Sequence, residues 1–379
     1  METLRKTETY TRFADYREME NLLDVIDKSD KWLNVNMASM KVGYIMPGTS
    51  PQYIYNGATQ EQVDAAYKSG TFTIRIEGEN YLVNPTTELT IGQTTETCCR
   101  LLSKFIKCER YEDAADLYNK GLSFLKKDTR VLVRGDQVMA MFSKNYCVLN
   151  QKLLFDRTHE LIMKRFPSAK FVTGSYTHEE TCAYYDLCDH QNQIFQKYKD
   201  AWSKSGFDED ELKAAKVYIR VATGDTGEFT YKITPYIVTR TWIPLGEPEK
   251  VKHYGKNTVD DIDDLVGIIF SHLESGLNRL ADMMDIDIPQ PIACVDALVK
   301  KIGLDKICPS IIVMLKNSIE LLEVMRSCDP KNRITAFTIY QTLLDAQYYP
   351  AFKKLESKTQ LKAWESFYKA SVIDWNKLI

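Results

Sequence analysis

Residues 216–242 read KVYIRVATGDTGEFTYKITPYIVTRTW and decide the fold of the middle of this chain. Two alternating runs flank a Gly-Asp-Thr-Gly turn at residues 224–227. One face of the pair is apolar or aromatic: Val217, Ile219, Val221, Phe229, Tyr231, Ile233 and Ile237. The other face is mostly basic, polar or aromatic: Lys216, Tyr218, Arg220, Thr230, Lys232, Thr234, Tyr236 and Arg240. Successive side chains of a strand point to opposite sides, so this pattern predicts an antiparallel hairpin with a buried apolar face and a solvent-exposed basic face.

The residues before this hairpin mix strand and helix patterns. Alternation predicts two further hairpins, at 72–83 and 131–143, and the second is apolar on both faces, which places it in the centre of a sheet. Residues 170–190 are ambiguous, although alternation there favours a strand. Helical stripes predict helices at 16–32, 60–68, 94–106, 112–125, 153–166 and 191–202.

The chain changes character after residues 244–258, which are rich in proline, glycine and charge. Helical stripes then dominate, at 262–284, 294–302, 309–325, 334–344 and 361–368. The predicted fold class is α+β: an antiparallel sheet built from hairpins with packed helices, followed by a helical C-terminal region. We predict an N-terminal helix and extended segment at 1–70, an α+β core domain at 71–255 and the helical region at 256–379.

The composition of the 379 residues is that of an ordinary globular protein, with 44% hydrophobic and 27% charged residues. The net charge of −3 gives no general attraction to polyanions, so a nucleic-acid site has to be a local patch. No apolar run approaches the roughly 20 residues that span a bilayer, and the polar N-terminus indicates no signal peptide. Nine irregularly spaced cysteines favour reduced thiols. We therefore expect a cytoplasmic protein without membrane contact.

Three patterns that resemble chemical sites have simpler explanations. Cys182 and Cys188 lie near His178 and His190, but on one strand the two thiols would be about 20 Å apart, too far for one metal ion. The acidic residues at 260–264 begin a helix, where they complement its dipole. The Gly-Asp-Thr-Gly turn lacks the second copy that an aspartic protease requires. The sequence thus predicts no catalytic residue, no metal and no cofactor.

The outer face of the hairpin is the strongest candidate surface. Residues 211–256 carry eight basic and five acidic side chains, although the whole chain is acidic. Proteins that bind single strands without sequence preference combine phosphate neutralisation with stacking of bases on aromatic rings. The candidate nucleic-acid-binding residues are Lys216, Tyr218, Arg220, Lys232, Tyr236, Arg240, Trp242 and Lys252. The alternative is a structural face whose aromatic rings cover a neighbouring helix.

Three passages carry a resemblance to a known family: VLVRGDQVMAMFSKNYCVLN at 131–150, ATGDTGEFTYKITPYIV at 222–238, and His253-Tyr-Gly-Lys256. Together they resemble the family described only as phage/plasmid-like protein, a domain of unknown function found on phages and other mobile elements. Gly224 stands where that family has serine, and its Cys-x-Asn element is replaced by 239–242, Thr-Arg-Thr-Trp. The resemblance implies mobile-element origin and life in a bacterial cytoplasm. By context it also implies DNA or RNA metabolism.

Three functions therefore stay open. The first is a non-enzymatic phage or mobile-element protein that binds single-stranded nucleic acid through the basic and aromatic face. The second is a protein–protein interaction module that engages host or phage proteins, for example to inhibit host defence, through C-terminal aromatic residues: Tyr348, Tyr349, Trp364, Phe367 and Tyr368. The third is an enzyme whose site is not visible in the sequence.

Overall fold

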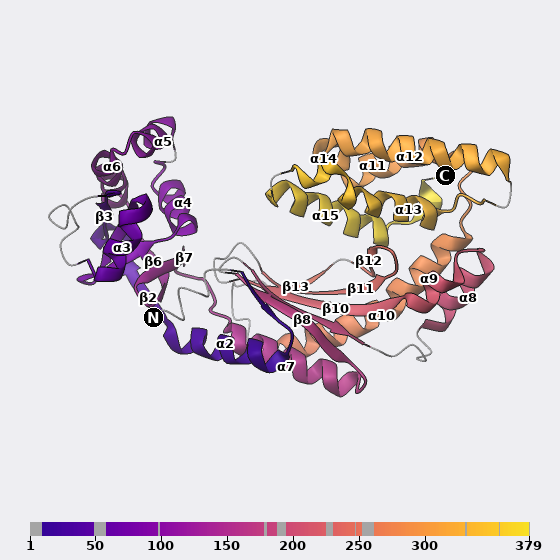
Figure 1. The fold of residues 1–379 in the computed structure, drawn as a ribbon, viewed down its shortest axis with the longest axis horizontal. Helices are drawn as coiled ribbons and strands as arrows, with labels where there is room; N and C mark the ends of the chain where they lie inside the picture. Colours follow the sequence, from indigo (N-terminus) through magenta and orange to yellow (C-terminus); the bar gives the residue numbers. More distant parts are fainter. Residues whose placement is uncertain are drawn as a thin grey trace.

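The computed structural model describes residues 10–48, 58–97, 99–177, 180–187, 195–224, 230–246, 248–251, 261–329, 332–355 and 357–378. It has the predicted α+β class: two sheets, each with packed helices, and a helical C-terminal layer (Figure 1). Among these residues no helix is both long enough and apolar enough to cross a membrane.

The first sheet has six strands and is formed by residues 30–143. Its spatial order is β2-β6-β7-β5-β4-β3, and all neighbours are antiparallel except β5 and β7. The strands are β2 (Asp30–Asn36), β3 (Lys41–Ile45), β4 (Thr71–Ile76), β5 (Glu79–Val83), β6 (Asp128–Arg134) and β7 (Gln137–Ser143). Its accompanying helices are η1 (Met37–Ser39), α3 (Gln60–Ser69), α4 (Pro85–Thr94), α5 (Arg100–Lys107) and α6 (Tyr111–Ser123).

Both hairpins predicted in this region are present, as β4–β5 and β6–β7. The second lies in the centre of the sheet, and apolar side chains cover it on both sides. Val131, Val133 and Val138 face the larger core, whereas Leu132 and Met139 face a smaller cluster. This confirms the expectation from its two apolar faces, because a strand that is buried on both sides has no polar alternation.

The second sheet contains the hairpin predicted within residues 216–242, as the pair β10–β11. Its order is β1-β8-β9-β10-β11-β12, and β13 pairs with the other part of β11. The strands are β1 (Thr11–Phe13), β8 (Lys170–Tyr176), β9 (Thr181–Asp186), β10 (Lys216–Thr223), β11 (Tyr231–Val238), β12 (Trp242–Pro244) and β13 (Glu249–Val251). Arg220 lies opposite Thr234 in the β10–β11 pair, and Tyr218 lies opposite Tyr236. The alternation therefore sorts the side chains to two faces as predicted.

Helices cover both faces of the second sheet (Figure 1). The apolar face packs with α7 and α10, and Thr158 of α7 shares a hydrogen bond with Tyr231. The helices on this side and at the ends of the sheet are α2 (Tyr16–Ser29), α7 (Gln151–Arg165), α8 (Gln196–Lys204), α9 (Glu209–Ala214) and α10 (Asp261–Asp285). The other face lies beneath the C-terminal elements: α11 (Pro291–Ile302), η4 (Leu304–Lys306), α12 (Pro309–Cys328), α13 (Ala336–Asp345), η5 (Ala346–Tyr348), α14 (Pro350–Lys353), α15 (Ser357–Val372) and η6 (Trp375–Lys377).

The sheets and cores do not follow the predicted boundaries at 70 and 255. Segment 1–70 supplies β1 to the second sheet and β2 and β3 to the first. One apolar core extends from Phe13 through the second sheet to Trp375, so the C-terminal helices share their core with that sheet.

The start of one predicted helix and the end of another were wrong. The helix predicted at 94–106 begins only at Arg100, as α5, and it is separated from the preceding α4 by a stretch that contains Glu96 with a φ of 57°. Asn84 caps α4 by accepting a hydrogen bond from the Thr87 amide at 2.7 Å, so α4 begins at Pro85, a helix that we did not predict from the sequence. Trp32 lies in β2 because α2 ends at Ser29.

Arg134 joins the two sheets. Its side chain, 5% exposed, makes a two-pronged ion pair with Asp30 at 2.6 and 3.0 Å. A third guanidinium nitrogen donates to the hydroxyl of Tyr176. Since Arg134 belongs to β6 and Tyr176 to β8, this cluster fixes the first sheet against the second.

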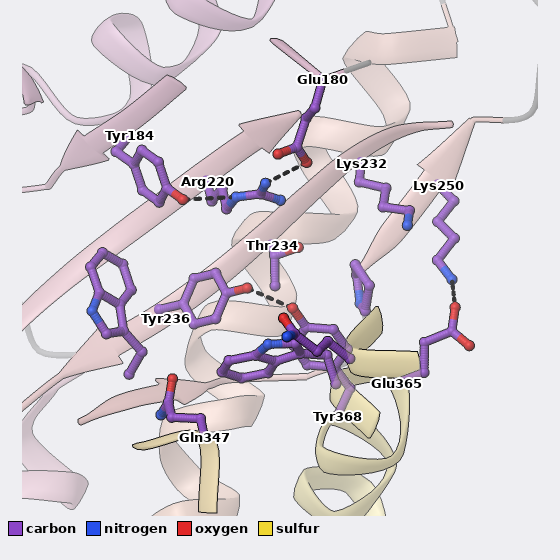
Figure 2. Close-up of a pocket in the computed structure, with 14 residues that line it drawn as sticks. Glu180, Tyr184, Arg220, Lys232, Thr234, Tyr236, Lys250, Gln347, Glu365 and Tyr368 are labelled. Carbon is purple, nitrogen blue, oxygen red and sulfur yellow. Dashed lines mark hydrogen bonds and ion pairs between the residues drawn. The ribbon is translucent and has the colours of Figure 1, made fainter. Parts of the chain in front are cut away.

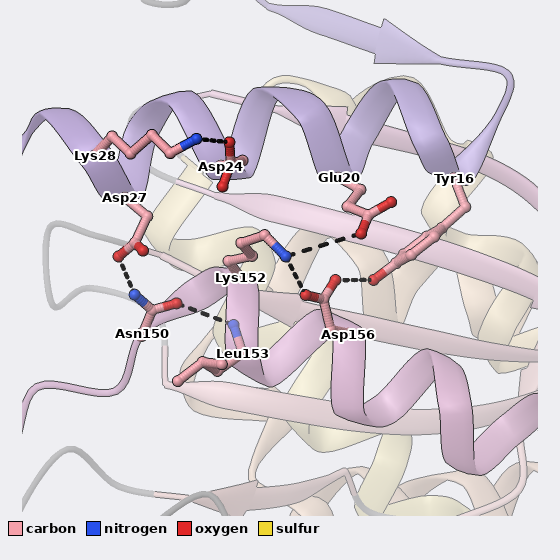
Figure 3. A network of polar contacts seen from close by, with 9 residues as sticks. All are labelled: Tyr16, Glu20, Asp24, Asp27, Lys28, Asn150, Lys152, Leu153 and Asp156. Carbon is pink, nitrogen blue, oxygen red and sulfur yellow. Dashed lines mark hydrogen bonds and ion pairs between the residues drawn. The ribbon is translucent and has the colours of Figure 1, made fainter.

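A polar network fixes α2 against α7 (Figure 3). Lys152 lies between Asp156, with which it forms an ion pair, and Glu20, whose carboxylate is 3.8 Å away. Tyr16 donates to Asp156 at 2.8 Å, and its ring stacks on His159 with the centroids 3.8 Å apart. His159 Nδ1 lies 3.2 Å from the hydroxyl of Tyr185.

This network makes stability depend on pH through His159. Burial lowers the pKa of His159, an effect that the nearby carboxylates Asp156, Glu20 and Glu160 only partly offset. The unfolded chain then binds more protons than the folded protein below about pH 6.5, so the free energy of unfolding falls as the pH drops through this range. We expect His159→Phe, which keeps a ring against Tyr16, to reduce this fall in urea unfolding measured at pH 5.5 and 7.5. An unchanged pH dependence in the variant would contradict the assignment.

Candidate functional site: a pocket beneath the C-terminal helices

A pocket of about 460 Å³ lies between the second sheet and the C-terminal helices (Figure 2). The sheet supplies one wall, and η5 and α15 supply the other. The residues that line it are Glu180, Tyr184, Arg220, Lys232, Thr234, Tyr236, Trp242, Pro248, Lys250, Gln347, Gln360, Trp364, Glu365 and Tyr368. Five of these side chains are aromatic and three are basic, and its volume is in the range typical of small-ligand sites.

The alternation of the strands explains why polar groups meet at this wall. Lys232, Thr234 and Tyr236 are two residues apart on β11, so they point to the same side. Arg220 joins them from β10, where it is the direct neighbour of Thr234. Tyr184 joins from β9, where it is the direct neighbour of Arg220.

Arg220 is held firmly within the pocket wall. Its Nη2 donates to Glu180 at 2.6 Å, and its Nε donates to the Tyr184 hydroxyl at 3.0 Å. Burial opposes its charge, but Tyr184 and Glu180 outweigh this effect and raise the pKa of the guanidinium above its ordinary value. Burial raises the pKa of Tyr184 itself to about 12, so at neutral pH the pair consists of a cation and a neutral phenol.

Two contacts connect the sheet wall to α15. The hydroxyls of Tyr236 and Tyr368 are 2.7 Å apart, and the Lys250 amine is 3.5 Å from Glu365 (Figure 2). Burial raises the pKa of both tyrosines above the ordinary value. Each therefore keeps its proton at neutral pH. One of the two protons lies in the hydrogen bond between the hydroxyls, and the other can be donated into the pocket.

Lys232 and Lys250 are cross-strand neighbours. They pair directly in the β11–β13 ladder, which brings their side chains to the same part of the pocket (Figure 2). Burial is the largest influence on Lys232 and lowers the pKa of its amine, and the nearby charge of Lys250 lowers it further. Glu365, which is 3.5 Å from Lys250, offsets part of the repulsion between the two amines, and an anionic ligand would relieve more of it.

Aromatic rings form the remainder of the site. Trp242 lies against Tyr184 at 5.6 Å, Tyr218 at 5.3 Å and Tyr236 at 5.6 Å between ring centroids. Trp364 on α15 lies 6.0 Å from Tyr368. Both tryptophans are half-buried, so each presents ring surface to the pocket.

The structure brings half of the predicted site residues together in this pocket. Arg220, Lys232, Tyr236 and Trp242 line it. Lys216 instead lies 3.3 Å from Asp186, and Arg240 lies in the β11–β12 turn at 3.5 Å from Asp345. Tyr218 packs against Trp242 without lining the pocket. Lys252 lies outside the described residues, as do His178, Cys188, His190 and the turn residues 225–229.

The expectation that this face is open to solvent was wrong. Tyr236 is 6% exposed, and the Arg220 side chain is 20% exposed. The physical reason is the C-terminal layer, because Tyr368, Trp364 and Gln347 lie over the strands. The face is therefore one wall of a pocket rather than an open platform.

The sequence reasoning missed several pocket residues. Glu180 and Tyr184 come from an ambiguous stretch. The strand register places Tyr184 opposite Arg220, and the ion pair places Glu180 beside it. Trp364 and Tyr368 were assigned to a protein-binding surface, although their separation of four residues does place them on one face of a helix. Of the other C-terminal aromatics in that set, Phe367 is fully buried and Tyr348 is 47% exposed.

Comparison with protein-family models, with curated proteins and with solved structures gives no match for this chain.

Proposed function

We propose that the protein binds single-stranded nucleic acid and that the pocket holds one nucleotide unit of the strand. The observation that supports this most is the combination of Arg220, Lys232 and Lys250 with aromatic rings around one cavity. Phosphate requires the cations, and a base stacks on an exposed ring.

The size of the pocket and its cover by α15 favour a single nucleotide over an extended track. A volume of about 460 Å³ has room for a base, sugar and phosphate, and the cover formed by α15 prevents several bases from lying flat across β10 and β11. The nucleotide in the pocket is then either the terminal one of the strand or an internal one that is rotated away from its stacked neighbours. The resemblance of residues 131–150 and 222–238 to phage/plasmid-like proteins supports a setting in the DNA or RNA metabolism of a mobile element in a bacterial cytoplasm.

Fluorescence anisotropy with a labelled oligothymidylate tests this function. We expect Lys232→Ala with Lys250→Ala to weaken binding by at least about tenfold, since hydrogen bonds to charged groups contribute about 1.5–3 kcal/mol each. The slope of log affinity against log salt should also become shallower by about 1.4, because each phosphate contact on a single strand contributes about 0.7. Arg220→Ala is less suitable, because it also removes the partner of Glu180.

The matched control is Lys213→Ala, which removes a lysine that is 73% exposed and outside the pocket. It should leave the affinity nearly unchanged. Competition by an unlabelled mononucleotide shows whether the preferred ligand is a free nucleotide or a strand. Equal affinity of the double variant and the control would contradict the proposal.

An exposed apolar stripe on α12 favours protein binding as a second candidate function. Val313, Leu321, Val324 and Met325 are between 48% and 62% exposed. They lie on a helix that contacts other C-terminal elements rather than the sheet, so this stripe is separate from the pocket.

A further inference from the structure

Lys232 combines three features that make a lysine amine reactive. It is half-buried in the pocket wall, it is the cross-strand neighbour of Lys250, and it lies on the same sheet face as Arg220. Lysines become nucleophilic when desolvation and a neighbouring cation favour the neutral amine over the ammonium ion.

We propose that Lys232 forms an imine with an aldehyde that is carried by a phosphate-bearing ligand. This inference rests on the proposed function, which supplies the phosphate contact, and it adds a covalent step to that binding. The lowered pKa of Lys232 has the direction that this reaction requires, and burial is its main cause. Arg220 stays charged in the same pocket and Lys250 lines it beside Lys232, so a phosphate there would share these cations with Glu180 and Glu365.

The reaction balances with groups that the pocket contains. The neutral Lys232 amine adds to the carbonyl carbon, and its nitrogen loses a proton as the carbonyl oxygen gains one. The resulting carbinolamine then loses its hydroxyl group together with the remaining N–H proton as water, which leaves a carbon–nitrogen double bond. The hydroxyl pair of Tyr236 and Tyr368 can relay these protons, because both groups stay protonated at neutral pH.

Two kinds of ligand offer this chemistry. One is a small phosphorylated aldehyde. The other is the ring-opened sugar at an abasic position of a single strand, where an aldehyde is flanked by phosphates. The second fits the proposed function, since a strand without the base at that position leaves room beside Trp242 and Trp364.

Borohydride trapping followed by peptide mapping tests the proposal. The unsubstituted protein is incubated at pH 7 with pyridoxal 5′-phosphate in one arm and with an oligonucleotide containing one abasic site in the other. We expect Lys232 to be the first lysine modified in at least one arm, and the arm that reacts at lower concentration identifies the source. Modification of exposed lysines such as Lys213 before Lys232, or no trapping in either arm, would overturn the proposal.

Lys232→Arg tests the imine, whereas binding of an unmodified oligothymidylate by the unsubstituted protein tests the proposed function separately. A guanidinium does not form an imine under these conditions, so the trapped product at position 232 should be lost. Lys213→Arg should retain trapping. Trapping that continues at the unsubstituted rate in Lys232→Arg would overturn the imine. Oligothymidylate binding by the Lys232, Lys250 double alanine variant tests the phosphate contacts of the proposed function, not the imine. Mapping of the unsubstituted protein decides the matter even if Lys232→Arg does not fold.

Discussion

Arg134→Met is expected to lower the free energy of unfolding by about 3–5 kcal/mol, the usual consequence of removing one partner from a buried ion pair. Arg134 is 5% exposed and Asp30 is 15% exposed, so water cannot fully replace the guanidinium. The substitution also removes the hydrogen bond to Tyr176, which links β6 to β8. Urea unfolding followed by circular dichroism measures the change.

Lys197→Met is the matched control for Arg134→Met. Lys197 lies 2.6 Å from Asp282, but the two side chains are 54% and 59% exposed. Exposed ion pairs contribute little because water and salt screen them. A loss of stability in Lys197→Met that equals the loss in Arg134→Met would show that burial at the junction of the sheets is not the cause.

Gly276→Ala should destabilise the protein by about 3 kcal/mol or more, the upper range for overpacking a core. A methyl group at this position of α10 would lie 2.1 Å from the carbonyl oxygen of Leu245 and 2.7 Å from its Cβ. Neither atom is the end of a flexible side chain, so the backbone has to move. Leu245 directly follows β12, which carries Trp242, and the movement would therefore disturb the pocket.

Gly267→Ala on the same helix gives the opposite expectation. No atom lies within 4 Å of a methyl group there, and alanine stabilises a helix interior by about 0.5–1 kcal/mol relative to glycine. The thermal unfolding temperatures of the two variants compare the same glycine-to-alanine substitution at a crowded and at an open position of α10. If Gly276→Ala were also stabilising, α10 could not lie as close to Leu245 as the structure places it.

The sequence predicts local pairing well because a period of two is a local property. The β10–β11 hairpin, its two faces and the central position of β6–β7 all follow from alternation over a few residues. The helix ends are less predictable, since the break at Glu96 depends on one left-handed residue.

The cover over the site could not be predicted, because alternation does not say what a face contacts. Tyr236 and Tyr368 meet although they are 132 residues apart in the chain, and β1 pairs with β8 across most of the N-terminal half. The contact of Tyr236 with Tyr368 of α15 matches the alternative prediction, in which the aromatic rings of this face cover a neighbouring helix. The same contact creates the pocket, so the basic face and its cover form one site.

The central claim is that a nucleotide unit occupies the pocket between the second sheet and α15. Ultraviolet cross-linking to a bromouridine-containing single strand, followed by peptide mapping, tests it most directly, because a cross-link forms only between touching groups. We expect cross-links at Trp364, Trp242 or Tyr184, and their loss when an excess of mononucleotide is present. Cross-links found only on α5 or α12, with none in the pocket, would contradict the account.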